Sequence, residues 1–183
     1  MVGRRPHFLV FRRNHSPFSR DIKDYQASNK TLSASRVFTH HEATVNDVQW
    51  HPMHGQNLFG SVSDDNTFCL VDLRDKRSGR AALRIKPHND AVNALAFHAK
   101  HDMLVATGSA DKTVGICDMR FPKHGKIHSM DGHADVVTKV EWHPHDSSIL
   151  ASSGDDRRVI FWDLSRTGEE QTPEDAEDGP PEQ

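Results

Sequence analysis

Residues 45–52, Val-Asn-Asp-Val-Gln-Trp-His-Pro, decide the fold, because similar stretches occur twice more along the chain. Residues 92–99 read Val-Asn-Ala-Leu-Ala-Phe-His-Ala, and residues 137–144 read Val-Thr-Lys-Val-Glu-Trp-His-Pro, at spacings of 47 and 45 residues. A histidine precedes each copy at the same offset, and these residues are His41, His88 and His133. The apolar content of each copy, bounded by turn residues, predicts a β-strand.

Two aspartates follow each copy, and the spacing between the two is constant. The first ends a strand of small residues, and the second comes seven residues later. The turn aspartates are Asp65, Asp111 and Asp156, and the strand-end aspartates are Asp72, Asp118 and Asp163. A period of about 45 residues with these markers is typical of WD40 repeats, each of which supplies four strands of a propeller blade. The sequence therefore predicts an all-β chain with about three four-stranded blades, whose outer strands lie at 35–39, 81–86 and 126–130.

The repeated histidines and turn aspartates are most simply structural. A buried imidazole needs hydrogen-bond partners, and a turn carboxylate supplies one of them. The indole of Trp162 can extend this network in the third unit, whereas Val71 and Cys117 stand at the same position in the first two units. We therefore expect the first two blades to be less firmly tied than the third.

Composition excludes several classes of protein. The chain has 183 residues and a formal net charge of -3. It has no apolar run of the roughly 20 residues that a membrane helix needs, and its two cysteines cannot build a disulfide framework or a cysteine-pair zinc site. Each histidine–aspartate set recurs once per repeat, whereas an active site is normally singular. The sequence therefore predicts no enzyme, no metal, no cofactor and no membrane partner.

Charge is concentrated at the two ends of the chain. Residues 1–20 contain five arginines and no acid, and residues 167–183 contain seven acids and no base. The opposite charges of the two ends indicate that each end binds a partner. The chain is not uniformly basic, as a nucleic-acid-binding protein would be, so direct DNA binding is not expected.

The chain from Asp21 to Glu182 resembles the histone-binding WD-repeat proteins, which include the retinoblastoma-binding chromatin subunits and the fungal histone acetyltransferase type B subunit 2. The resemblance rests on residues 40–52, 106–114 and 149–158 and on the segment 161–182, which is acidic and contains two adjacent prolines. It implies a seven-bladed propeller of which this chain holds part.

The resemblance also implies two histone-binding regions. An acidic loop within a blade grips the first helix of histone H4, and Asp175 and Asp178 are the expected arginine partners, as charge-assisted pairs. The expected loop residues are Glu174, Asp175, Glu177, Asp178, Gly179, Pro180 and Pro181. The histone H3 tail is expected on the flat face, where the matching positions are Asn46, Asn93 and Thr138.

The implied function is a non-catalytic scaffold subunit that presents histone H4 within a type B histone acetyltransferase or a chromatin-assembly complex. Its expected partners are the histones and the catalytic or assembly subunits, in the nucleus and the cytoplasm. Two alternatives remain open: a WD40 interaction adaptor unrelated to histones, or a non-functional fragment from a truncated gene model.

The sequence also predicts how the chain is divided. Residues 1–20 match nothing in the family and are expected to be a disordered stretch. Residues 21–166 form the partial propeller, with repeat units at about 37–80, 81–125 and 126–166, and residues 167–183 form an acidic, proline-rich loop or tail.

Overall fold

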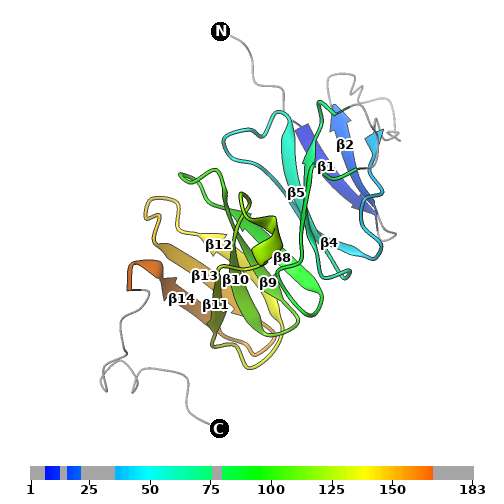
Figure 1. Cartoon of the computed structure of the whole chain (residues 1–183). Helices are drawn as coiled ribbons and strands as arrows, with labels where there is room; N and C mark the ends of the chain where they lie inside the picture. The colour runs from blue at the N-terminus through cyan, green and yellow to red at the C-terminus, as the bar shows by residue number, and fades with distance from the viewer. Residues whose placement is uncertain (1–6, 13–15, 22–35, 76–79, 167–183) are drawn as a thin grey trace, which may run out of the picture.

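Four antiparallel sheets follow one another along the chain. The computed structural model describes residues 7–12, 16–21, 36–75 and 80–166, and Figure 1 shows the sheets from the blue N-terminal strands to the orange strand β14. The all-β partial propeller predicted from the repeats is therefore confirmed. None of the described helices is long and apolar enough to cross a membrane.

Each sheet is a meander in which strands that are consecutive in sequence pair with one another. The first and last sheets along the chain have three described strands each, and the second and third sheets have four. The first sheet contains β1 (His7–Arg12), β2 (Ser16–Asp21) and β3 (Arg36–Val37). The second contains β4 (Val45–Trp50), β5 (Leu58–Ser63), β6 (Phe68–Asp72) and β7 (Leu83–Ile85). The third contains β8 (Val92–Phe97), β9 (Leu104–Ser109), β10 (Thr113–Asp118) and β11 (His128–Asp131). The fourth contains β12 (Val137–Trp142), β13 (Ile149–Gly154) and β14 (Val159–Asp163). Two short 3-10 helices, η2 (Pro122–His124) and η3 (Leu164–Arg166), lie in connections.

The sequence repeat and the structural blade are offset by one strand. Strand β7 precedes β8 in the chain but pairs with β6, and β11 precedes β12 but pairs with β10. Each sequence unit therefore begins with the outer strand of one blade and continues with the inner strands of the next. This arrangement fastens neighbouring blades covalently through the chain.

Residues 7–12 and 16–21 form strands that the sequence did not predict. β1 pairs with β2 over the whole of both strands, and β2 pairs with β3. The first sheet thus includes residues that fall within the stretch 1–20, for which the sequence predicted disorder. β2 ends at Asp21, the residue at which the resemblance to the WD-repeat proteins begins.

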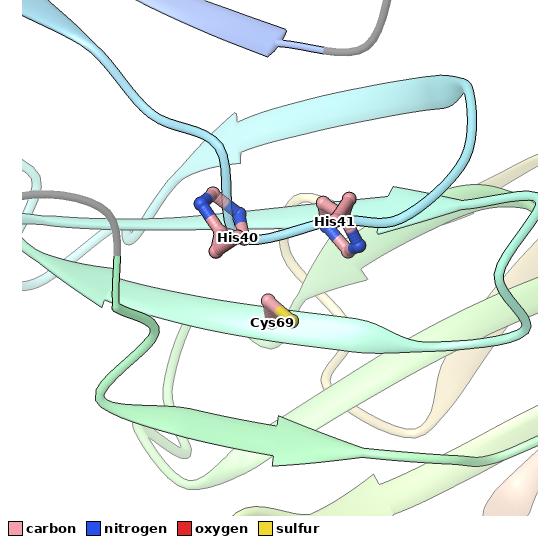
Figure 2. Close-up of side chains that lie close together, drawn as sticks. All are labelled: His40, His41 and Cys69. Atoms are coloured by element: carbon pink, nitrogen blue, oxygen red, sulfur yellow. The ribbon is translucent and has the colours of Figure 1, made fainter.

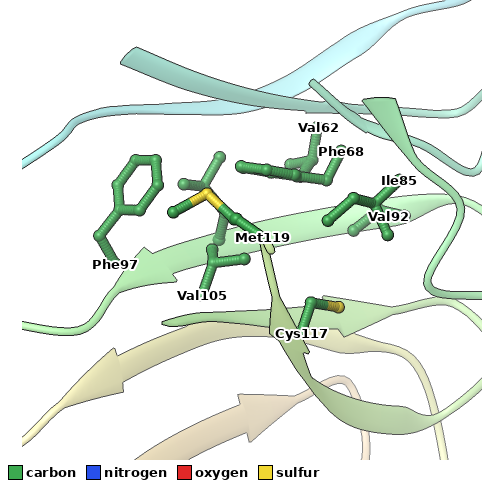
Figure 3. Close-up of a cluster of buried hydrophobic side chains, with 9 residues drawn as sticks. Val62, Phe68, Ile85, Val92, Phe97, Val105, Cys117 and Met119 are labelled. Atoms are coloured by element: carbon green, nitrogen blue, oxygen red, sulfur yellow. The ribbon is translucent and has the colours of Figure 1, made fainter. Parts of the chain in front are cut away.

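The hydrophobic core lies between neighbouring sheets. One cluster fills the space between the second and third sheets, and Figure 3 shows its aromatic, aliphatic and sulfur-containing side chains meeting there. Its buried members are Val62, Phe68, Ile85, Val92, Leu95, Phe97, Val105, Cys117 and Met119. A second cluster joins the third and fourth sheets. Its buried members are Ala94, Ala96, Ala106, Val114, Ile116, Val137, Val140, Trp142 and Leu150.

Glycine at two strand positions allows the sheets to approach closely. A Cβ added at Gly60 would lie 2.7 Å from atoms of both Phe68 and Phe97, and one added at Gly108 would lie 2.6 Å from Val137 Cγ1. Real Cβ atoms do not tolerate such contacts because protein interiors are already close-packed. The small residues that precede the aspartate turns are therefore required by packing between blades.

The aspartate turns share one backbone conformation. The residue after each turn aspartate has a positive φ, at 65° for Asn66, 70° for Lys112 and 64° for Arg157. The left-handed region is costly for residues with a side chain, so its recurrence shows that the surrounding bonds determine the turn. Arg157 is exposed in this turn.

Candidate functional site

A β-bulge recurs near the start of each innermost strand. The register shifts between Val45 and Asp47 in β4, between Val92 and Ala94 in β8, and between Val137 and Lys139 in β12. The skipped residues are Asn46, Asn93 and Thr138, the positions at which the sequence placed the histone H3 tail. A bulge leaves its extra residue outside the ladder and redirects its side chain.

The bulged asparagines reach across to the next blade. Asn46 Nδ2 donates to Val92 O at 2.9 Å and to Asp64 Oδ1 at 2.7 Å. Asn93 Nδ2 donates to Val137 O at 3.0 Å. Thr138 differs, because its hydroxyl donates to Ser153 O of its own sheet at 3.2 Å and its side chain is exposed. The amide groups of the asparagines therefore join blades as well as lining this edge of the sheets.

Further along the innermost strands, side chains satisfy backbone groups of the neighbouring blade. Asp47 Oδ2 accepts the N–H of Leu95 at 3.2 Å, and Gln49 Oε1 accepts the N–H of Phe97 at 2.7 Å. Trp142 Nε1 donates to Ala96 O at 3.0 Å. These bonds occupy groups that would otherwise be buried without a partner.

The histidines that follow β4 and β8 also tie one blade to the next. His51 Nε2 lies 2.9 Å from Asp102 O, and His98 Nε2 lies 2.9 Å from Ser147 O. Since a carbonyl accepts, each Nε2 donates, and the Nδ1 atoms accept backbone N–H groups of their own turns. His143, which follows β12, accepts backbone N–H groups of its own turn in the same way.

The third repeat contains a complete buried hydrogen-bond chain. Trp162 Nε1 donates to Ser152 Oγ at 2.8 Å, and Ser152 Oγ lies 2.7 Å from His133 Nε2. His133 Nδ1 lies 2.8 Å from Asp156 Oδ2. Since the carboxylate accepts from Nδ1, the Ser152 hydroxyl donates to Nε2. This chain ties strands β13 and β14 to the segment before β12.

The first repeat completes the same chain with a different residue. His41 Nδ1 lies 2.9 Å from Asp65 Oδ2, and His41 Nε2 lies 2.9 Å from Ser61 Oγ. The third member is His40, whose Nε2 lies 2.8 Å from the same Ser61 oxygen. Val71 stands where the third repeat has Trp162, so His40 supplies the hydrogen bond that the valine cannot. The sequence did not predict His40 as a member of this network.

One sequence comparison could have identified His40. Its counterpart in the third repeat is Gly132, where an added Cβ would lie 2.7 Å from Trp162. Histidine at that position is possible only where the tryptophan is absent. The joint change from glycine and tryptophan to His40 and Val71 was therefore the signal.

The second repeat has the shortest chain. His88 Nδ1 lies 2.9 Å from Asp111 Oδ2, and His88 Nε2 lies 2.9 Å from Thr107 Oγ1. Pro87 and Cys117 occupy the positions of His40 and Trp162 in the other repeats, so neither an indole nor a second imidazole extends it.

Burial and hydrogen bonding shift the pKa values in these chains. Burial lowers the pKa of His40 to about 4, with the adjacent His41 and Arg84 acting in the same direction. Burial would raise the pKa of Asp65, but hydrogen bonds from Thr67, Glu42 N–H and His41 outweigh it and lower the pKa to about 2. His40 is therefore neutral and Asp65 is charged at neutral pH.

The strand-end aspartates bind their own turns. Asp72 accepts two guanidinium nitrogens of Arg74, and Asp118 accepts two of Arg120. Asp163 Oδ1 accepts the hydroxyl of Ser165 at 2.6 Å. Hydrogen bonds from these arginines lower the pKa values of Asp72 and Asp118. All of these aspartates are thus engaged in local structure.

Exposed carboxylates gather at the edge where the innermost strands begin. Asp64 lies beside the start of β4, since its N–H donates to Thr44 O, and Asp155 lies beside the start of β12, since its N–H donates to Val136 O. Asp90 and Asp135 occupy equivalent positions just before β8 and β12. All four aspartates are exposed, so this edge presents carboxylates, with the ammonium group of Lys112 beside them on Ala134 O.

The other predicted histone-binding region lies outside the described residues. Glu174 to Pro181 fall within the segment 167–183, which the structure does not describe. The assignment of the acidic loop to histone H4 therefore remains a prediction from the sequence.

Comparison with known proteins gives one family. The WD domain, G-beta repeat model matches residues 32–72, 80–118 and 124–163. A histone acetyltransferase type B subunit 2 of Debaryomyces hansenii is 43% identical over 158 residues, which cover 82% of this chain and 37% of the relative. The protein of the same name in Candida glabrata is 41% identical over 142 residues, covering 78% of this chain and 32% of the relative.

The chain spans about a third of the length of these curated relatives. Within that span, each of the three matched segments contains one of the repeated stretches at 45–52, 92–99 and 137–144. The relatives also carry the name that the sequence resemblance had indicated, and that resemblance is confirmed. The chain belongs to the WD40-repeat family.

Proposed function

We propose that this chain is part of a non-catalytic WD40 scaffold subunit that presents histone H4 within a type B histone acetyltransferase. The observation that carries the proposal is the 43% identity over 158 residues to a protein of that complex. The repeated His–Asp chains support a non-catalytic role, because their polar groups are bonded to one another and to the backbone in every unit.

The described surface supports a basic protein partner. The edge formed by Asp64, Asp90, Asp135 and Asp155 is exposed and acidic, and it lies next to the bulged residues Asn46 and Asn93. Lysine and arginine side chains of a histone tail would meet carboxylates there, and complementary charge favours both encounter and specificity. We assign the histone H3 tail to this edge, with Asn46, Asn93 and Thr138 as its contacts.

The acidic segment is assigned to histone H4. Glu174, Asp175, Glu177 and Asp178 can accept charge-assisted hydrogen bonds from a basic helix, and Pro180-Pro181 limits the conformations that the loop must lose on binding. The expected partner is the first helix of histone H4, with Asp175 and Asp178 as its arginine partners.

The assembled protein would meet further subunits. A catalytic acetyltransferase subunit or chromatin-assembly subunits are the proposed partners, consistent with the printed names of the relatives. A nuclear role follows from association with a histone acetyltransferase, and the cytoplasm is proposed as a second location.

The test is the affinity of the chain for a peptide of the first histone H4 helix, measured by fluorescence anisotropy. Asp175→Lys with Asp178→Lys should weaken binding by more than about tenfold, because like charges would then face each other. Glu169→Lys with Glu170→Lys makes the same charge change outside the assigned loop and should alter binding by less than about threefold. Equal losses in both double variants would overturn the assignment of the loop. Absence of binding by the unaltered chain would favour a WD40 adaptor unrelated to histones.

A further inference from the structure

Three potential metal ligands converge in the first repeat. One ring nitrogen each of His40 and His41 and the sulfur of Cys69 all lie within 4.8 Å of one another. Figure 2 shows the two histidines on the segment that leads to β4, with Cys69 facing them from β6. All three residues are buried, so packing restricts their side chains.

The hydrogen-bond network leaves ligand lone pairs in this cluster. His41 Nδ1 donates to Asp65, so its Nε2 carries the lone pair and accepts from the Ser61 hydroxyl. That hydroxyl has one hydrogen, so His40 Nε2 must donate to Ser61 Oγ, which places the His40 lone pair on Nδ1. Among the described residues, His40 Nδ1 is the one buried side-chain nitrogen or oxygen atom that has no hydrogen-bond partner.

An unsatisfied buried acceptor is costly and calls for an explanation. A bound metal ion would supply a partner for this nitrogen, and Asp65 would then hold the outer nitrogen of His41, as carboxylates commonly do for metal-bound imidazoles. Ser61 lies between the two rings and offers a further oxygen. Three residues of ligand type therefore occur together with a carboxylate on His41 and an unpartnered ring nitrogen on His40.

The repeats act as an internal comparison. At the positions of His40 and Cys69, the second repeat has Pro87 and Gly115, and the third has Gly132 and Ile160. The remaining chain of His, Ser or Thr, and Asp is shared by all three units. Both additional ligands thus occur together in one unit, and neither belongs to the His, Ser or Thr, and Asp chain that all three units share.

We propose that His40, His41 and Cys69 form a zinc site that ties the segment before β4 to strand β6. Two imidazoles and a thiolate are ligands that zinc accepts, with a fourth position for Ser61 Oγ or water. Zinc bonds of about 2.1 Å to nitrogen and about 2.3 Å to sulfur hold ligand atoms roughly 3.5 Å apart, so the groups must close by about 1 Å. Binding releases the Cys69 thiol proton to solvent, which balances the formation of the zinc–sulfur bond.

An arginine side chain borders the cluster. Arg84 bonds to His40 O and lies 4.0 Å from Asp65 Oδ2, and its side chain is 42% exposed. The metal ion would enter past this side chain.

The experiment uses the full chain with Co²⁺ as a spectroscopic probe and Zn²⁺ as a competitor. A thiolate-to-cobalt charge-transfer band is expected at one equivalent, and added Zn²⁺ should abolish it. Cys69→Ser should lose the band and weaken zinc binding by more than about tenfold. Cys117→Ser, at the other buried cysteine, should retain both properties.

Cobalt spectra without a thiolate band would overturn the proposal, because the exposed histidines alone would then explain metal uptake. A band that persists in Cys69→Ser would overturn it equally. Circular dichroism of each variant shows whether it is folded, and His40→Gln keeps Cys69 in place and should weaken zinc binding by more than about tenfold. Unchanged zinc affinity in a folded His40→Gln variant would contradict the assigned ligand set.

Discussion

At the scale of single residues, the repeated polar side chains are joined into short buried chains whose members depend on one another. Ser152 is the central member in the third repeat, since its hydroxyl contacts both Trp162 Nε1 and His133 Nε2. Removing such a hydroxyl leaves two buried polar groups without a partner, and each unsatisfied group costs about 1–3 kcal/mol.

Ser152→Ala should therefore lower the free energy of unfolding by about 2–4 kcal/mol. The control is Ser153→Ala. Ser153 is the next residue in the same strand and is partly exposed, and its side chain makes none of the hydrogen bonds that join Trp162, Ser152 and His133. Urea unfolding followed by tryptophan fluorescence measures both variants. Equal stability of the two variants would contradict the assigned role of Ser152.

The second repeat predicts loss of stability in acid. Burial lowers the pKa of His88 below its ordinary 6.5, and Asp111 has a pKa below its ordinary 3.8 because hydrogen bonds from Thr113 and interactions with His88 outweigh burial. As the pH falls through 6.5, His88 is protonated in the unfolded chain before it is protonated in the folded chain. As the pH falls through 3.8, Asp111 is likewise protonated first in the unfolded chain. Stability should therefore be full above 6.5 and fall as the pH decreases through both values.

Thermal unfolding at pH 7.5 and pH 5.5 tests this dependence. His88→Gln should be less stable than the unaltered chain at pH 7.5, and it should lose less stability between the two pH values because residue 88 no longer titrates. A larger acid loss in His88→Gln would contradict the stated sign.

At the scale of elements, the interfaces between blades depend on glycines that admit a neighbouring side chain. Gly108→Ala would place a Cβ 2.6 Å from Val137 Cγ1. Overpacking of this kind costs about 1–3 kcal/mol, so the variant should unfold at a lower urea concentration.

A second substitution identifies the cause of that loss. Val137→Ala removes the clashing methyl groups, so Gly108→Ala with Val137→Ala should be more stable than the sum of the two single changes predicts. Strict additivity in the double-mutant cycle would show that the strain does not arise between β9 and β12.

The strands themselves were predictable from the sequence for a physical reason. The turn aspartates and the small residues before them occur in all three units at nearly the same spacing. A marker that recurs in three units is distinguished from a chance match in one. The predicted outer strands at 81–86 and 126–130 contain or overlap β7 and β11. In contrast, no repeat marker falls within residues 7–12, and the strand there was missed.

The polar chains were only partly predictable because they involve residues that depart from the repeat. Trp162 is visible as a marker, but His40 replaces it from a different strand position, and sequence order alone does not show that two such positions meet. Cys69 likewise faces the histidines only once β6 is placed beside the segment before β4. Spacing rules for zinc look for ligand pairs close in sequence, so they do not find this cluster.

At the scale of the whole molecule, the three repeats form one continuous body held by contacts between consecutive blades. Side chains of β4 bond to the backbone of β8, and Asn93 of β8 bonds to the backbone of β12. The two main clusters of buried apolar side chains lie across these same interfaces. The acidic edge is therefore presented on a framework whose parts are fixed relative to one another.

The central claim is that this framework belongs to a histone scaffold, and hydrogen–deuterium exchange of the chain with and without the first-helix peptide of histone H4 tests it most directly. We expect slower exchange in residues 174–181 on binding and unchanged exchange in the strands of the second sheet. Binding without protection of residues 174–181, or protection confined to the sheets, would contradict the claim.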